Sequence, residues 1–371
     1  MRVIVIGSGI AGASTAYHLA RAGADVVVVD ALHDGRATDA GAGIVSPWTS
    51  RTLDGFQYDL ADRSGAYYRE LVGQLEEDSG QNCSFEIVGG MVVSADDDEL
   101  AEVQQRVGAR ARISLYAGTV RRLDAAEARE LFPPLAPGFG AVHVTGAGRV
   151  DGRVLRAALL NAAVARGARF HEGEARLRRT GDRVDGVELT DRAIEADAVV
   201  VAAGAWSSAL LEPLGVRLAV TPQRGQISHF LLPDVDTSAW PVVLPTSSHY
   251  LLAFPGSRVV AGATRETGSG FDHRITAAGQ QEVLDNALGV APGLAESTLL
   301  ETRIGFRPLS ADGAPLLGPL DEHPEVYVVS GFGPTGLTLG PYAGYLAATE
   351  LTGSAAPMDL SSLRPERISL P

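Results

Sequence analysis

The sequence contains no lysine and a single cysteine, Cys83. Because every permanently cationic side chain is an arginine, the chain has no lysine to form a Schiff base, to act as a general base or to activate oxygen. One cysteine excludes an intramolecular disulfide and a cysteine-based metal site, and so favours a reducing cytoplasm. No apolar run approaches the roughly 20 residues that cross a bilayer. We therefore expect no transmembrane segment, and no signal peptide, because Met1 leads directly into an apolar stretch.

Basic residues are also few for a chain of 371 residues: there are 31 against 45 acidic ones, and the formal net charge is −14. This balance argues against a nucleic-acid partner and against binding to an anionic membrane surface. The hydrophobic fraction of 45% and the charged fraction of 20% are ordinary for a globular protein. The length predicts two domains, which need not be contiguous in sequence.

The most informative motif that is present lies in residues 2–30. An apolar strand leads into Gly7-Ser8-Gly9-Ile10-Ala11-Gly12, and a helix and a second apolar strand ending at Asp30 follow. In such a unit the first glycine permits a tight turn, the second lets the backbone approach a pyrophosphate, and the third lets the helix pack closely on the strand. The start of the helix offers free N–H groups to phosphates, and the carboxylate of Asp30 can accept the ribose hydroxyls. The unit predicts dinucleotide binding.

The remaining sequence alternates between helical and strand patterns. We predict helices over about residues 59–75, 98–110, 125–131, 154–166 and 337–351. We predict strands over 85–93, 194–204, 224–232, 250–254, 258–262 and 326–330, a hairpin turn at Gly181-Asp182, and mainly strand between 220 and about 302. Strand and glycine-turn segments thus lie at the start, middle and end of the chain, with two β-rich segments inserted between them.

This layout and its motifs resemble the D-amino-acid oxidase-type family of FAD-dependent oxidoreductases, which includes glycine and sarcosine oxidases and D-amino-acid dehydrogenases. The resemblance covers nearly the whole chain. It implies an α/β fold in which residues 1–84, 146–220 and 304–371 form a discontinuous, Rossmann-like FAD-binding domain. Residues 85–145 and 221–303 would form a β-sheet-rich substrate domain. Members with covalent flavin use a cysteine in the C-terminal half, so the position of Cys83 implies noncovalent FAD.

A nicotinamide-dependent dehydrogenase is the competing interpretation, because Asp30 would also suit NAD. Two segments favour FAD. Residues 37–44 resemble the family loop that carries the flavin from pyrophosphate to ring, with Asp39 where the family usually has serine or threonine. Residues 331–338 resemble the turn and helix start that face the flavin and stabilise negative charge on it. The cofactor residues that the resemblance implies are Gly7, Ser8, Gly9, Ile10, Ala11, Gly12, Asp30, Ala31, Arg36, Ala37, Thr38, Ala42, Gly43, Ile44, Ala175, Ala203, Gly204, Trp206, Arg307, Gly331, Gly333, Pro334, Thr335, Gly336, Leu337 and Thr338.

The resemblance also implies a small set of substrate residues. Residues 301–318 resemble the family segment in which an arginine, here Arg307, binds the substrate carboxylate. Tyr250 matches a tyrosine whose phenol donates to the same carboxylate. Arg265 lies where glycine oxidase-like sequences have an apolar pocket residue. Pointing inward, it would add a second cation that favours an acidic or polar substrate side chain; pointing outward, which we favour, it would be an exposed charge at a strand end. His249 and Trp48 are candidates for the pocket wall.

Together these residues predict oxidation of an α-amino acid or N-substituted glycine. A hydride would pass from Cα to flavin N5, and the imine would hydrolyse to a 2-oxo acid and ammonia or an amine. One alternative is a flavin-dependent 2-hydroxy-acid dehydrogenase, which needs a base, for which His249 is the candidate. Another is a flavin-binding protein without turnover. The electron acceptor, O2 or a quinone-type carrier, and the oligomeric state stay open, although the absence of lysine favours a dehydrogenase or a slow oxidase.

Overall fold

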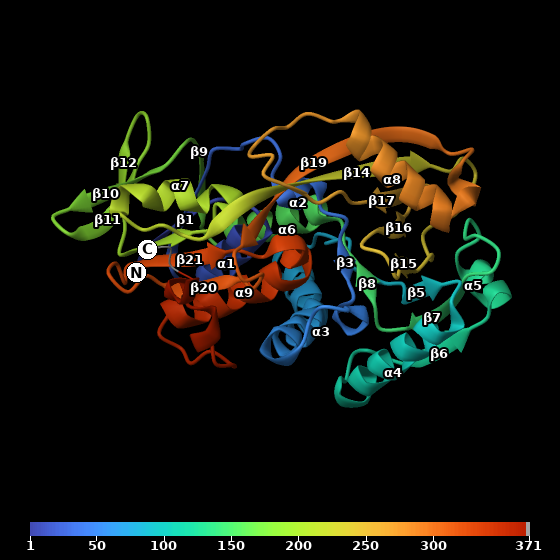
Figure 1. Cartoon of the computed structure of the whole chain (residues 1–371). Helices are drawn as coiled ribbons and strands as arrows, with labels where there is room; N and C mark the ends of the chain where they lie inside the picture. Colours follow the sequence, from blue (N-terminus) through green and yellow to red (C-terminus); the bar gives the residue numbers. More distant parts are fainter. Residues whose placement is uncertain (369–371) are drawn as a thin grey trace.

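The computed structural model describes residues 1–368, which form two halves, each built on a sheet. Figure 1 shows strands β10, β11 and β12 at the left of the molecule and helices α4, α5 and α8 at the right. No helix within the described range is long and apolar enough to cross a membrane.

The first half is organised around a six-stranded sheet within residues 1–368. All neighbouring strands are parallel except the last pair. In order across the sheet they are β9 (Arg169–Glu172), β2 (Asp25–Asp30), β1 (Arg2–Ile6), β13 (Ala198–Val201), β21 (Val326–Ser330) and β20 (Leu316–Pro319). Parallel strands joined through helices place their carboxyl ends at one edge, where ligands of such folds bind.

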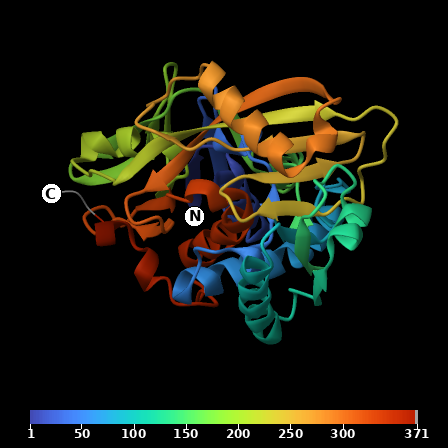
Figure 2. The ribbon, with the colours of Figure 1, turned by 45° about the vertical axis from the view of Figure 1, so that its right-hand side comes forward.

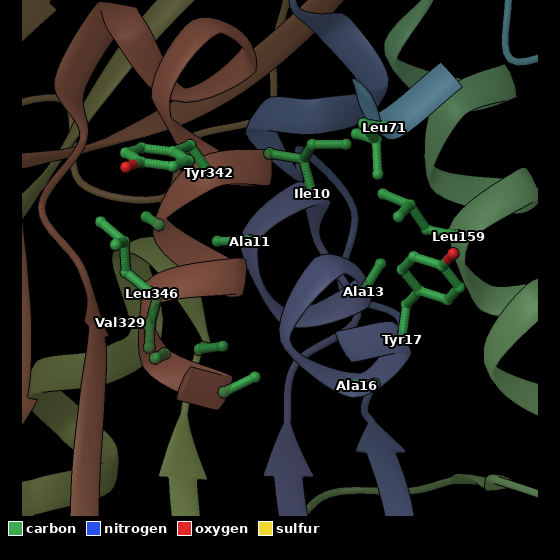
Figure 3. Close-up of a cluster of buried hydrophobic side chains, with 14 of the residues drawn as sticks. Ile10, Ala11, Ala13, Ala16, Tyr17, Leu71, Leu159, Val329, Tyr342 and Leu346 are labelled. Atoms are coloured by element: carbon green, nitrogen blue, oxygen red, sulfur yellow. The ribbon is translucent and has the colours of Figure 1, made fainter. Parts of the chain in front are cut away.

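Two layers cover this sheet because the side chains of each strand alternate between its faces. Val3 and Val5 of β1 pack against helices, whereas Ile4 and Ile6 pack on the opposite side with residues of a smaller sheet. Figure 3 shows the centre of the helical layer, where Ala13 and Tyr17 of α1 lie between α9 on one side and α6 on the other. The helices are α1 (Ile10–Arg21), α3 (Gly55–Ser79), α6 (Gly152–Ala165) and α9 (Gly336–Leu351), and the smaller sheet consists of β10 (Arg176–Thr180), β11 (Arg183–Glu188) and β12 (Ala193–Glu195).

The second half contains a larger, mostly antiparallel sheet. Its opposite faces carry α4 (Asp97–Ile113) and α8 (Ala277–Val290), which Figure 2 shows on opposite sides in teal and orange. Also here is α5 (Ala125–Leu131). The strands are β5 (Gly90–Ser94), β6 (Val120–Leu123), β7 (Gly140–Val144), β14 (Val220–Leu231), β15 (Val242–Pro245), β16 (Tyr250–Phe254), β17 (Arg258–Gly262), β18 (Glu266–Thr267) and β19 (Thr298–Ser310).

Short elements join the two halves. The strands β3 (Ile44–Val45), β8 (Gly148–Arg149) and β4 (Glu86–Ile87) form a small antiparallel sheet between them. The last residues of β19 reach the first half, where Leu309 bridges to Phe332. Two short helices, α2 (Ala37–Ala40) and α7 (Ser207–Leu211), complete the first half.

The predicted α/β class is confirmed, and each predicted helix is present with ends shifted by a few residues. Three strand predictions were wrong in detail. Residues 85–93 form two strands, β4 and β5, separated at Val88 and Gly89. Residues 194–204 also form two, because β12 pairs with β11 whereas β13 joins the central sheet, and the Asp197 carboxylate between them accepts the Arg2 N–H at 2.7 Å. The strand-rich stretch from 220 to 302 contains helix α8, capped by the Thr276 hydroxyl, which accepts the Gly279 N–H. The proposed domain boundaries stay a prediction.

Candidate active site

A long cavity of about 580 Å³ runs between the two halves. At one end it is lined by Gly173 to Leu177, beside β10, and it passes the ends of β1 and β2. At the other end it reaches Tyr250 of β16 and Arg307 of β19. A cavity that starts at a dinucleotide-binding turn and ends on a second sheet has the form of a site for an extended cofactor and a small substrate.

Two glycines of the motif, Gly7 and Gly12, are packed too tightly for any side chain. Gly7 has a φ of +98°, and a Cβ there would lie 2.4 Å from the carbonyl oxygen of Ala202. A Cβ on Gly12 would lie 2.0 Å from the carbonyl oxygen of Gly7. This close approach places the start of α1, with Gly9 and Ile10, in the cavity wall. The helix therefore directs its positive end at the cavity, as a pyrophosphate requires.

Asp30 is held rigidly at the end of β2. Its Oδ2 accepts hydrogen bonds from the Ser8 N–H at 2.5 Å and the Ser8 hydroxyl at 2.6 Å, and its Oδ1 accepts the Leu32 N–H at 2.6 Å. Asp30 lines the cavity, whereas Ser8 is fully buried and lies behind it. Ser8, which we predicted to bind the cofactor, is thus placed to orient the Asp30 carboxylate that lines the cavity.

The unexpected acid Asp39 points away from the cavity. Its carboxylate accepts from the Arg36 guanidinium, with Nη2 to Oδ2 at 2.6 Å, and Arg156 lies 4.0 Å away on the other side. The two arginines offset its charge, so an acid is tolerated near the phosphates. Arg36 itself lines the cavity, and its Nη1 is buried without a hydrogen-bond partner in the described structure. That donor is free to meet a phosphate oxygen.

The start of α9 also lines the cavity, close to the start of α1. Thr335 precedes this helix without a side-chain cap, so its hydroxyl does not occupy the first-turn N–H groups. The Thr338 hydroxyl donates to the Ile44 carbonyl at 2.9 Å and so ties the helix to the loop at 41–44. Both segments line the cavity, as the two pieces of a flavin site would.

Most predicted cofactor residues therefore surround one space, and their chemistry fits FAD. Four do not line it: Ser8, Gly12, Gly331 and Thr335, which lie behind its wall. Cys83 is buried in the helical core and does not reach the cavity, so it offers no thiol for a covalent bond to the flavin. The lining includes Gly7, Gly9, Ile10, Ala11, Asp30, Ala31, Arg36, Ala37, Thr38, Ala42, Gly43, Ile44, Ala175, Ala203, Gly204, Trp206, Arg307, Gly333, Pro334, Gly336, Leu337 and Thr338.

Arg307 lies at the second-sheet end of the cavity with no carboxylate partner among residues 1–368. Its Nη1 donates to the Thr264 carbonyl at 2.9 Å, and the guanidinium also bonds the Tyr250 hydroxyl. The nearest acid, Glu266, is engaged elsewhere: its Oε2 accepts Arg224 Nη2 at 2.5 Å and its Oε1 accepts the Thr264 hydroxyl at 2.7 Å. Burial lowers the pKa of Arg307, yet a guanidinium keeps its charge at any physiological pH.

Tyr250, the first residue of β16, lies beside Arg307. It pairs with Gly262 of β17, and a Cβ on that glycine would lie 2.7 Å from the phenol oxygen. Burial raises the pKa of Tyr250 to about 12, although the positive charges of Arg307 and Arg265 oppose the rise. The phenol therefore stays protonated at neutral pH and can donate to an anion.

The structure places the three residues expected near the pocket wall. Arg265 lines the cavity and is also exposed after the end of β17, so the inward and the outward interpretation each hold in part. His249 does not line the cavity and instead faces Glu282 of α8, with Nε2 to Oε1 at 3.4 Å. Trp48 does not line it either: the ring is fully buried, and its indole N–H donates to Asp62 at 2.7 Å. Both residues contribute to packing around the site. Their local sequences did not show this, because they do not indicate in which direction each side chain points.

Other lining residues were missed by sequence reasoning. At the cofactor end, Arg176 and Glu188 come from the β10–β11 hairpin, and His33 stacks on Trp206 with ring centroids 4.9 Å apart. At the end that holds Arg307, Gly225 and Gly305 face each other in the β14–β19 ladder. Two glycines within long strands were the available signal, because glycine in a strand often marks a close approach.

Fold and cavity together define an oxidoreductase that binds a dinucleotide across two sheets. The DAO family model, described as FAD dependent oxidoreductase, matches residues 2–350. The oxidoreductase YurR of Bacillus subtilis is 44% identical over 98% of both chains, and a glycine oxidase of Pseudomonas aeruginosa is 31% identical over 98% of both. The structure of iminodiacetate oxidase from Chelativorans sp. BNC1 is 46% identical, with a TM-score of 0.95 over 98% of this chain and 99% of that one. The chain therefore belongs to the DAO family of FAD-dependent oxidoreductases, and the predicted family and cofactor are confirmed.

Proposed function

We propose that this protein oxidises an α-amino acid or an N-substituted glycine at the Cα–N bond. The observation that carries the proposal is Arg307, a cavity guanidinium that donates to neutral groups and has no carboxylate partner within the described residues. A substrate carboxylate would supply the missing charge through two parallel hydrogen bonds. The relatives named as glycine and iminodiacetate oxidases support this substrate class, since both named compounds are amines that carry carboxylate.

In this proposal the chain contributes mainly orientation. Arg307 and Tyr250 bind the carboxylate and so fix the direction of the Cα–H bond. FAD, when bound, supplies the hydride acceptor. The nitrogen lone pair of the substrate assists departure of the hydride, and the resulting imine adds water to give a 2-oxo acid and ammonia or an amine. Tyr250 keeps its proton throughout, because burial raises its pKa to about 12.

The lining residues near Arg307 include no general base. Among the described lining residues the one histidine is His33, which stacks on Trp206. The lining carboxylates are Asp30, Glu174 and Glu188, and the first two lie together at the cofactor end, since Gly173 N–H bonds the Asp30 carbonyl. An amine needs no base if it binds unprotonated, whereas an alcohol does. This favours amine oxidation over the 2-hydroxy-acid alternative, and kcat/KM should rise with pH toward the pKa of the substrate amine.

The test is anaerobic mixing of the holoenzyme with D-, L- and N-methyl amino acids and with the matching 2-hydroxy acids. Bleaching of the flavin absorption band by amines alone is the expected result. Arg307→Met should weaken the reduction about 100-fold while FAD stays bound. Arg303→Met, on the same strand but paired with Glu301 and outside the cavity lining, is the matched control. Bleaching by hydroxy acids but not amines would overturn the proposal, and so would bleaching by neither class.

The same experiment tests which electron acceptor the protein uses. We propose slow reoxidation by air, because the chain has no lysine that could activate oxygen. Rapid return of the flavin band on admitting air would contradict this and identify a fast oxidase. We propose the cytoplasm as the site of action, on the support of a single, buried cysteine.

A further inference from the structure

A second arginine without a carboxylate partner lies at the substrate end of the cavity. Arg265 follows Thr264 in the chain and lines the cavity at its open side. Its Nη2 lies 3.5 Å from the carbonyl oxygen of Ser248, another lining residue. No ion pair of Arg265 occurs among residues 1–368.

Arg265 and Arg307 act on the same space. The carbonyl of Thr264, the residue before Arg265, accepts the hydrogen bond from Arg307 Nη1 at 2.9 Å. The charge of Arg265 contributes to lowering the pKa of Arg307 and also opposes the rise in the pKa of Tyr250. Two guanidinium groups therefore face one pocket, and Glu266, which could have offset them, is bound to Arg224.

We propose that Arg265 binds a second carboxylate, so that the preferred substrate is an amine carrying two carboxylates. This inference rests on the proposed function. One carboxylate would bind Arg307 and Tyr250 inside the cavity, and the other would bind Arg265 at its mouth. A substrate with one carboxylate leaves one of the two like charges without an anion, whereas a dicarboxylate neutralises both.

A secondary amine with two acetate arms, such as iminodiacetate, meets this requirement. The arm held by Arg307 loses a hydride from its Cα to FAD and a proton from its nitrogen to solvent, which forms a C=N bond. Water adds to that carbon and the C–N bond breaks, giving glyoxylate and glycine. The two electrons stay on the cofactor until the acceptor removes them, and Arg265 holds the arm that leaves as glycine.

The test compares ligands that differ by one carboxylate and cannot be oxidised at a C–N bond. Diglycolate and methoxyacetate are ether analogues of iminodiacetate and sarcosine, and binding to the holoenzyme is measured by the shift of the flavin spectrum. We expect the wild type to bind diglycolate about 10- to 100-fold more tightly than methoxyacetate, the worth of one charged hydrogen-bonded contact. Arg265→Gln should remove this preference, because the contact that it loses is the one made to the second carboxylate of diglycolate. Arg129→Gln, an exposed arginine on α5 outside the lining, removes the same charge and should retain the preference.

The outcomes separate this inference from the proposed function. An equal affinity of the wild type for both ligands, or a preference that survives in Arg265→Gln, overturns the role of Arg265. Loss of the preference in Arg129→Gln as well would show a general charge effect and also overturn it. Flavin reduction by sarcosine or glycine with no advantage for iminodiacetate would leave amine oxidation standing and reject the dicarboxylate class. Diglycolate selectivity without reduction by any amine would reject the proposed reaction alone.

Discussion

The guanidinium of Arg307 occupies the space that a side chain at position 225 would fill. A Cβ on Gly225 would lie 2.6 Å from Nη2 and 2.7 Å from Cζ of Arg307. The two residues lie on neighbouring strands, because Gln223 pairs with Arg307 and Gly225 with Gly305 in the β14–β19 ladder. The position of the proposed carboxylate anchor, Arg307, thus depends on the absence of a side chain at position 225 of the neighbouring strand.

Gly225→Ala should therefore displace the anchor without unfolding the protein. The atoms that a methyl group would meet are the end of a flexible side chain and not backbone. We expect KM for the amine to rise about 10-fold, with FAD affinity and melting temperature close to those of the wild type. Gly73→Ala is the control, since a Cβ at that position on α3 would meet nothing within 4 Å. An unchanged KM in Gly225→Ala would show that the guanidinium does not position the substrate.

Asp30→Asn should weaken FAD binding. The substitution keeps the size of the side chain but removes the charge that accepts the Ser8 and Leu32 N–H groups and faces the cavity. We expect the Kd for FAD, measured by titrating apoprotein, to rise about 10- to 100-fold. Asp25→Asn is the control. Asp25 lies at the other, exposed end of β2 and pairs with Arg2, so this variant should bind FAD as the wild type does. Equal Kd values for the two variants would contradict the role of Asp30.

Trp48→Phe should lower stability and leave catalysis intact. The indole N–H donates to Asp62 at 2.7 Å and to the Ser114 hydroxyl at 2.9 Å, and both contacts disappear in the variant. We expect the free energy of unfolding to fall by about 1–3 kcal/mol, which chemical denaturation of the holoenzyme would measure. The value of kcat/KM should stay within about twofold of the wild type. A large fall in kcat/KM at full FAD occupancy would contradict this and indicate that Trp48 contributes to the substrate pocket.

Acid should destabilise the protein through His229 on β14. Burial lowers the pKa of His229 to about 4, with the charge of Arg303 adding to the effect and that of Glu301 opposing it. Between about pH 6.5 and 4 the unfolded chain binds more protons than the folded one, so stability falls as the pH falls through this window. In His229→Leu the loss of unfolding free energy across this pH window should be smaller than in the wild type by up to about 3 kcal/mol. Thermal melts at a series of pH values check this, and a slope equal to that of the wild type would contradict it.

Sequence reasoning succeeded where a function depends on consecutive residues. The turn from Gly7 to Gly12 and the acid at Asp30 are a local pattern, and the structure places them around one cavity. Arg307 and Tyr250 came from resemblance to a family, and the structure brings them into hydrogen-bond contact. Whether these residues bind FAD and substrate stays a prediction that the experiments above address.

Sequence reasoning failed where a role depends on which way a side chain points. His249 and Tyr250 are adjacent, but Tyr250 begins β16 and lines the cavity, whereas His249 precedes the strand and faces α8. Arg265 follows the end of β17, where alternation no longer fixes direction, and it both lines the cavity and is exposed. The contribution of Arg176 and Glu188 could not be foreseen, because tertiary packing alone brings their hairpin to the cofactor end.

The ladder between β14 and β19 extends from Val220 paired with Ser310 to Leu231 paired with Thr298. It belongs to the second sheet, yet its β19 end is bridged to Phe332 of the first half. A hinge between the halves would have to break this bridge and the one between Arg36 and Phe306, so the two halves are expected to move as one body. The cavity then keeps a fixed length. We therefore expect the protein to select ligands by whether their dimensions match the cavity, and not by closing around them.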